Sequence, residues 1–135
     1  MNKKYENAGN KKTVKLKEPL ISIDNLEVKF INQDATIHAV NGVDIKLDKG
    51  KVLTILGESG SGKSVTMRSI LRLLPPKASL SGSIIVDGKN IIDMSQDQLS
   101  SMRGHEVSMI FQEPMVAFDP VYKVGSQIAE TVVRH

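Results

Sequence analysis

Residues 57–64 constrain this chain most, because their sequence GESGSGKS satisfies the pattern G-x-x-x-x-G-K-[ST]. Glycines let the backbone fold closely around a phosphate, so that successive N–H groups point inward, and a helix that begins here adds its positive dipole end. Lys63 supplies a cation for β- and γ-phosphate oxygens, and the Ser64 hydroxyl is placed to bind Mg²⁺. The pattern therefore predicts a nucleotide-binding loop. The alternative is a flexible Gly/Ser loop with an incidental lysine.

The residues on either side of this loop have the patterns that such a loop requires. Residues 52–56 form a nearly continuous apolar run, typical of a strand covered on both faces. After the loop, apolar residues recur at the spacing of one helix face: Met67, Ile70, Leu71 and Leu74. Pro75 and Pro76 would stop this helix. We expect a buried central strand, the loop at its C-terminal end, and a helix from about Gly62 to Leu74.

Other segments predict a mixture of strands, turns and helices. Apolar residues alternate with polar ones in residues 26–30 and 43–47, which predicts two half-buried strands with a polar loop at 32–35. Residues 83–86 and 89–92 flank Asp87-Gly88, the composition of a hairpin with a primed turn. Ser95 and Gln98 fit the capping box of a short helix. We also expect a strand at 107–111 and a helix at 125–135 whose apolar side is Ile128, Ala129, Val132 and Val133.

Composition narrows the class of protein. The chain has 135 residues and is 40% hydrophobic, enough for one domain with a core. It has no cysteine, which excludes disulfides, thiolate metal sites and a cysteine nucleophile. No apolar run reaches the length of a membrane helix or of a signal-peptide core, so we expect a soluble cytosolic polypeptide.

The charge of +3 is concentrated at the N-terminus, where residues 1–17 hold six lysines against Glu6 alone. Such a stretch buries too little apolar surface to order itself, so we expect residues 1–18 to be a disordered basic tail and residues 19–135 to be the folded part. A tail that binds phosphate or an anionic membrane is the alternative. Tyr5 is its one aromatic residue, and we expect no nucleic-acid partner.

Three segments together resemble the ATPase subunit of ABC transporters. They are the P-loop (Walker A) at 57–64 with Val65 and Thr66 after it, residues 81–84 (SGSI), and residues 109–115 (MIFQEPM). Glu58 in the loop, Val65 after it, and Pro114-Met115 followed by Asp119-Pro120 are most similar to the oligopeptide/dipeptide/nickel importers. The similarity runs from about Leu20 to the last residue. It implies an α/β fold, an incomplete P-loop NTPase core of ABC type with an antiparallel β subdomain ahead of and beside the phosphate loop.

The resemblance also implies site residues, with ATP and Mg²⁺ as cofactors. Phe30 matches the aromatic residue that stacks on adenine, although a core phenylalanine is the alternative. Gln112 matches the Q-loop glutamine, which approaches Mg²⁺ or the attacking water; taken alone it would be a surface amide. Lys63 and Gln112 are the implied catalytic residues, and Ser64 and Gln112 the implied metal ligands. The implied nucleotide-binding residues are Phe30, Gly57, Glu58, Ser59, Gly60, Ser61, Gly62, Lys63, Ser64 and Val65.

In this family hydrolysis also requires an LSGGQ-like signature, an apolar strand ending in Asp-Glu, and a switch histidine, and none of these follows Gln112. Residues 84–87 resemble the apolar strand superficially, but Gly88 stands in place of the catalytic glutamate. His38, His105 and His135 are scattered and lack metal-ligand spacing. We expect the chain to be the N-terminal part of a longer domain and to be inactive alone.

The expected parent is the ATP-binding subunit of an ABC importer, which couples ATP binding and hydrolysis to uptake of oligopeptides or related small substrates. The resemblance implies permease subunits and a second ATPase subunit, as homodimer or heterodimer, as partners, with a substrate-binding protein acting indirectly. It implies a peripheral position on the cytoplasmic face of the cell membrane. The alternatives are a truncated, catalytically dead nucleotide-binding module and an ABC-type ATPase that works without a permease.

Overall fold

The computed structural model describes residues 18–113 and 118–134. The prediction of a basic tail therefore lies outside the described residues, except at Glu18. Pro114 and Met115, which carry part of the resemblance, and His135 also lie outside them. In chain order the elements are β1 (Ile21–Ile31), β2 (Thr36–Leu47), α1 (Lys63–Ile70), β3 (Ala78–Val86), β4 (Lys89–Asn90), α2 (Gln96–Met102) and α3 (Val124–Arg134).

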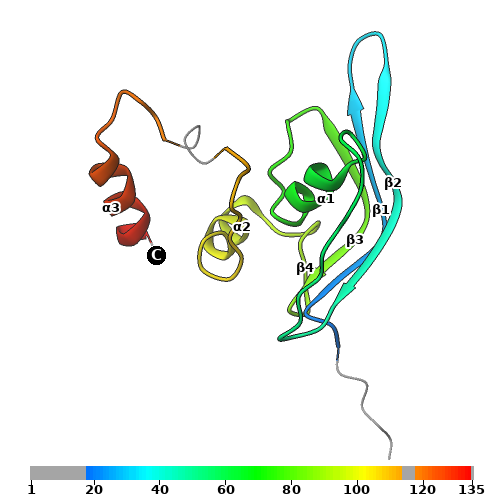
Figure 1. Cartoon of the computed structure of the whole chain (residues 1–135), viewed down its shortest axis with the longest axis horizontal. Coiled ribbons are helices and arrows are strands. Elements are labelled where there is room, and N and C mark those ends of the chain that lie inside the picture. Colours follow the sequence, from blue (N-terminus) through cyan, green and yellow to red (C-terminus); the bar gives the residue numbers. More distant parts are fainter. Residues whose placement is uncertain (1–17, 114–117, 135) are drawn as a thin grey trace, which may run out of the picture.

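The four strands form one antiparallel sheet in the order β2-β1-β3-β4 (Figure 1). The two predicted alternating strands are confirmed as parts of β1 and β2. Leu26 and Val28 are fully buried, whereas Asp44 and Lys46 on β2 are exposed. The polar loop between the strands is also confirmed, because the Asn32 amide donates to the Ala35 carbonyl at 2.9 Å and closes the turn.

The predicted hairpin after Val86 is confirmed. Asp87 and Gly88 have φ angles of +44° and +78°, both positive as a type I′ turn requires. Behind the turn the Ile91 amide donates to the Ile84 carbonyl at 2.8 Å. Lys49 lies 2.6 Å from the Asp87 carboxylate, and the hydrogen bond from its ammonium lowers the pKa of Asp87.

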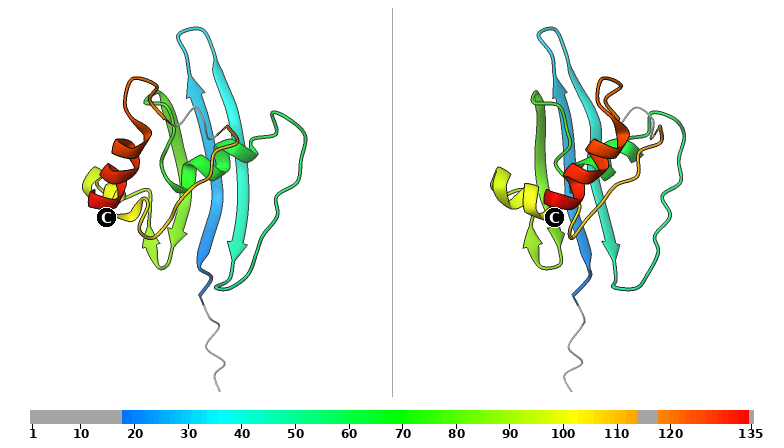
Figure 2. Two further views of the ribbon diagram at one scale, coloured as in Figure 1. Left: turned by 60° about the vertical axis from the view of Figure 1, so that its left-hand side comes forward. Right: turned by 90° about the vertical axis from the view of Figure 1, so that its left-hand side faces the viewer.

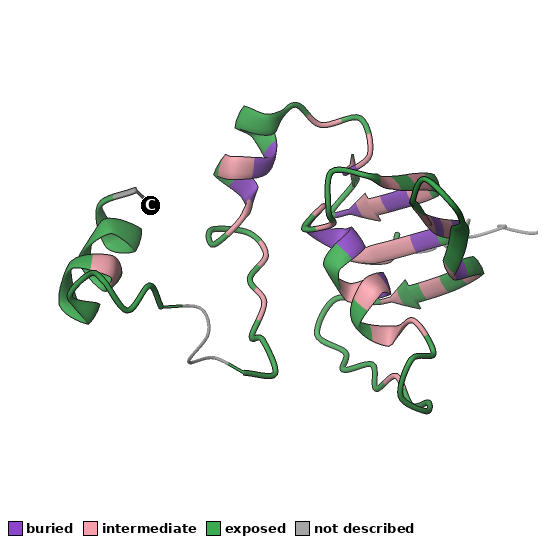
Figure 3. Cartoon of the chain, turned by 90° about the horizontal axis from the view of Figure 1, so that it is seen from above, coloured by how far each residue is buried: buried purple, intermediate pink, exposed green. Residues whose placement is uncertain are grey.

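The core lies between one face of the sheet and the helices that cover it. Helix α1 crosses the sheet and contacts β1, β2 and β3 (Figure 2). The buried residues gather on the sheet and on the sides of α1 and α2 (Figure 3). The buried apolar side chains are Ile23, Leu26, Val28, Val40, Ile70, Leu71, Ile84, Val86, Ile91, Leu99 and Met102.

Helix α1 begins where the sequence predicted but ends at Ile70, so the extension to Leu74 was wrong. Arg72 has a φ of +49°, and its amide donates to the Ser69 carbonyl at 3.0 Å. The Leu73 amide reaches back to the Arg68 carbonyl at 2.9 Å. These two bonds form a Schellman motif, which ends the helix ahead of Pro75.

The predicted central strand at residues 52–56 is not formed. These residues have no regular structure, and Val52 and Leu56 are 95% and 87% exposed. The strand predicted at 107–111 is also absent: Val107 makes one isolated bridge to Arg103, and Ile110 is 93% exposed. A buried parallel strand needs hydrogen-bonded neighbours and a layer of helices on each face, and no strand among residues 18–113 and 118–134 pairs with either run.

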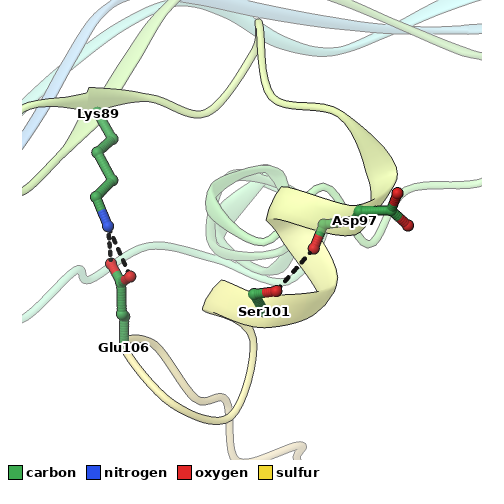
Figure 4. A network of polar contacts seen from close by, with 4 residues as sticks. All are labelled: Lys89, Asp97, Ser101 and Glu106. Carbon is green, nitrogen blue, oxygen red and sulfur yellow. Dashed lines mark hydrogen bonds and ion pairs between the residues drawn. The ribbon is translucent and has the colours of Figure 1, made fainter.

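The short helix α2 confirms the predicted capping box. The Ser95 hydroxyl accepts from the Gln98 amide at 3.3 Å, and the Gln98 side chain accepts from the Ser95 amide at 2.8 Å. The Ser101 hydroxyl donates to the Asp97 carbonyl within α2 (Figure 4). Beside it, the Lys89 ammonium holds the Glu106 carboxylate at 2.6 Å, which ties β4 to the segment after α2.

The predicted C-terminal helix is confirmed as α3, but it stands apart from the sheet in Figures 1 and 3. Its expected apolar side is open: Ile128, Val132 and Val133 are 53%, 72% and 87% exposed. Helix α3 therefore adds little to the core.

A matched pair of valines tests where this chain places its core. We expect Val28→Ala to lower the free energy of unfolding by about 2 kcal/mol, because the residue is fully buried. Val52→Ala should change it by less than about 0.5 kcal/mol, because its side chain is already in solvent. Urea unfolding followed by circular dichroism measures both. A large loss for Val52→Ala would show that residues 52–56 are packed.

Candidate functional site

The predicted phosphate loop lies between an extended segment and the first residue of α1. Figure 2 shows the chain leaving β2, running outside the sheet and turning back into α1. Residues 59–62 form turns, and the Ser61 amide donates to the Glu58 carbonyl at 3.3 Å. The loop is therefore held by the start of α1, and not by a strand as the sequence predicted.

The start of α1 is pressed against β2 at Gly62. This residue is the N-cap of the helix and has a φ of +89°. A Cβ atom there would lie 2.5 Å from the Ala39 carbonyl oxygen, so the close approach of helix to strand requires glycine. The Thr66 amide and hydroxyl both donate to the Gly62 carbonyl, at 2.9 and 3.0 Å.

No side chain caps the N-terminus of α1, and its first turn contains no acidic residue. A helix leaves its first N–H groups without intrahelical partners, and its dipole makes this end positive. Both features favour an anion at this end. The local structure therefore fits a phosphate group.

The Lys63 side chain folds back into the loop. Its ammonium donates to the Gly57 carbonyl at 2.7 Å, the Glu58 carbonyl at 2.5 Å and the Ser61 hydroxyl at 3.2 Å. All three acceptors are neutral, and none of the ion pairs among the described residues involves Lys63. The Lys63 ammonium thus forms no ion pair with a carboxylate of the described residues, although the loop also contains the exposed Glu58.

The other side chains of the loop differ in how far they are exposed to solvent. Glu58, Ser59 and Ser64 are exposed, whereas Val65 is half-buried against the core. Within the described part of the chain, no group of three or more His, Asp or Glu side chains is arranged to hold a metal ion. Mg²⁺ commonly keeps waters and combines one or two protein oxygens with substrate phosphates, and the Ser64 hydroxyl fits such a single ligand.

Phe30 and Gln112 come from different parts of the fold. Phe30 lies on β1, opposite Ile37 and Ala78, and is half-buried against the core. This placement is compatible with the core role that the sequence left open, and the stacking role stays a prediction. Gln112 is exposed and follows Phe111, whose ring centroid lies 6.0 Å from the Arg68 guanidinium on α1.

The sequence did not predict the hydrogen bonds of two other arginines, Arg72 and Arg103. It assigned no role to Arg72 or Arg103, yet both donate hydrogen bonds to backbone carbonyls of distant segments. The sequence carries no local signal for these bonds, because the partners are more than 20 residues away in the chain.

Comparisons of the sequence with known proteins point to one family. A family model described as ABC transporter matches residues 40–133. The oligopeptide transport ATP-binding protein OppD of Bacillus subtilis (strain 168) is 41% identical over 118 residues, 86% of this chain and 33% of its own length. The dipeptide transport ATP-binding protein DppD of Lactococcus lactis subsp. cremoris (strain MG1363) is 39% identical over 119 residues, 87% of this chain and 34% of its own.

A third relative is the peptidoglycan transport ATP-binding protein YejF of Agrobacterium fabrum (strain C58 / ATCC 33970), 45% identical over 120 residues, 87% of this chain and 22% of its own length. The chain therefore spans about a third or less of the length of these relatives.

Two glycines of the loop test the close packing at Gly62. We expect Gly60→Ala to lower the free energy of unfolding by about 1–2 kcal/mol, because its φ is +82° but nothing lies within 4 Å of the new Cβ. Gly62→Ala should lower the free energy of unfolding by more than Gly60→Ala does, because the Ala39 carbonyl must also move to make room for the new Cβ. Urea unfolding of both variants measures the difference, and equal losses would contradict the packing of α1 on β2.

Proposed function

Because the chain belongs to the ABC transporter family, we propose that it forms the phosphate-binding part of the ATP-binding subunit of an importer for oligopeptides, dipeptides or related small substrates. The observation that carries this proposal is the uncapped start of α1 with the Lys63 ammonium held inside the loop before it. The substrate class follows the names of relatives about 40% identical to this chain.

The residues that hold the nucleotide are proposed to be those of the loop. The free N–H groups at the start of α1 would receive phosphate oxygens, and the Lys63 ammonium would exchange its neutral acceptors for charged ones. Such charge-assisted hydrogen bonds are stronger than those it gives up. The Ser64 hydroxyl would hold Mg²⁺, which neutralises charge that develops on the phosphates.

Two further residues complete the proposed site. Phe30 would offer its exposed ring surface to the adenine, since stacking needs a flat apolar face. Gln112 would bring its amide toward the metal or the attacking water. The contact between Arg68 and Phe111 supports this placement, because it holds the residue next to Gln112 against the helix that begins at the phosphate loop.

The proposed partners are permease subunits in the membrane and a second ATP-binding subunit. No described helix is both long and apolar enough to cross a bilayer. We propose a peripheral position on the cytoplasmic face of the membrane, where a substrate-binding protein would act through the permease.

Replacing Lys63 tests nucleotide binding directly. We expect Lys63→Ala to weaken MgATP binding by the 135-residue chain at least tenfold, about 1.4 kcal/mol, because the one ammonium inside the loop is lost. The fold should persist, because water can replace the ammonium at the exposed carbonyls. Isothermal titration measures the affinity, with Lys123→Ala as a control of equal charge on an exposed residue. Equal affinity in wild type and Lys63→Ala would contradict the site.

The chain alone should bind MgATP without hydrolysing it. Phosphoryl transfer to water requires held phosphates, a held metal and a positioned water, and these contributions act as a unit. The loop would hold the phosphates and supply one ligand of the metal, the Ser64 hydroxyl. We expect phosphate release at the rate of a protein-free blank. If the chain released phosphate above the blank and Lys63→Ala abolished this release, a carboxylate of this chain would have to position the water.

A further inference from the structure

Two arginines, Arg72 and Arg103, join the C-terminal end of α1 to both ends of α2; we name them the arginine clamp. The Arg72 guanidinium donates from Nη1 to the Met94 carbonyl at 2.7 Å and to the Ile92 carbonyl at 3.4 Å, just ahead of α2. Arg103, the C-cap of α2, donates from Nε to the Leu71 carbonyl at 2.9 Å and from Nη2 to the Arg72 carbonyl at 3.2 Å.

The clamp is reciprocal. Each arginine belongs to one helix end and binds the backbone of the other, so neither helix can shift without breaking bonds at both ends of α2. Both side chains are half-buried, which limits competition from water. Arg103 also places a cation beside the last carbonyls of α1, where the helix dipole is negative.

The clamp lies at the start of the segment that carries Gln112. Val107 makes a bridge back to Arg103, and the Lys89 ammonium holds Glu106 (Figure 4). At the far end of the segment the Phe111 ring lies 6.0 Å from the guanidinium of Arg68, which belongs to the last turn of α1. The segment from 103 to 111 is therefore attached to α1 at both ends.

We propose that Arg72 and Arg103 are positioning residues that fix Gln112 relative to the phosphate loop. Helix α1 carries Lys63 at its first residue and the clamp just after its last, so it links the two sites as one rigid element. The role of this link in nucleotide binding rests on the proposed function of the loop. The competing explanation is that the clamp merely stabilises α2.

The first experiment tests the clamp without nucleotide. In the 135-residue chain we expect Arg103→Gln to speed amide hydrogen exchange at Arg72 and Leu73, just after α1. The same should hold at the hydrogen-bonded amides of Leu99, Arg103, Gly104, Glu106 and Val107. Lys123→Gln removes an exposed charge elsewhere and should leave those rates unchanged. Unchanged exchange in both Arg103→Gln and Arg72→Gln would overturn the clamp.

The second experiment separates positioning from stability with a double-mutant cycle. We expect Arg103→Gln to weaken MgATP binding at least fivefold in the wild-type background but less than twofold in the Gln112→Ala background. Arg103→Lys should restore part of the affinity, because it keeps the charge and some donors. Equal losses in both backgrounds, or no loss in either, would overturn the positioning role.

The two proposals fail in different ways. Wild-type chain that binds no MgATP would refute the nucleotide-binding loop and with it the positioning of Gln112 toward a nucleotide. The exchange rates would still decide whether Arg72 and Arg103 fasten α2 and the following segment to α1.

Discussion

The packing of α1 across the antiparallel sheet determines where the candidate phosphate loop of this molecule lies. Ile70 and Leu71 at the end of α1 bury themselves against a sheet face built from residues such as Ile23 and Ile84. Gly62 at the other end lets the helix start approach the Ala39 carbonyl. Because α1 is fixed at both ends, the phosphate loop and the arginine clamp are fixed with it.

The chemistry of the loop follows from local charge. Lys63 is surrounded by carbonyl and hydroxyl oxygens, and the first turn of α1 has no carboxylate that would compensate its dipole. A cation beside a helix N-terminus that no side chain caps favours an anion as its ligand. The ABC transporter family model matches residues 40–133, which include this loop.

Two apolar runs, residues 52–56 and 107–111, form no strand of the sheet because no described strand pairs with them. Val52, Leu56 and Ile110 are almost fully exposed, although their sequence patterns are those of buried strands. Parallel strands gain stability from neighbours on both sides and from helices on both faces. Within the described ranges the sheet contains antiparallel pairs alone, and α1 packs on one of its faces.

The sequence by itself determined the features that depend on neighbours close in the chain. Strands β1 and β2, the Asp87-Gly88 turn, the Ser95 capping box and the start of α1 at Lys63 all follow from alternation, turn geometry or hydrogen bonds within a few residues. The glycine-lysine motif likewise predicted the loop at the start of α1, whereas the roles predicted for Lys63, Phe30 and Gln112 in binding and catalysis stay predictions.

The tertiary structure alone decided two other features: the exposure of residues 52–56, and the fastening of α2 by Arg72 and Arg103. A strand exists when another strand pairs with it, and a guanidinium is engaged when a distant carbonyl comes within reach. Both conditions depend on contacts between segments far apart in the chain, which a local pattern of residues does not contain.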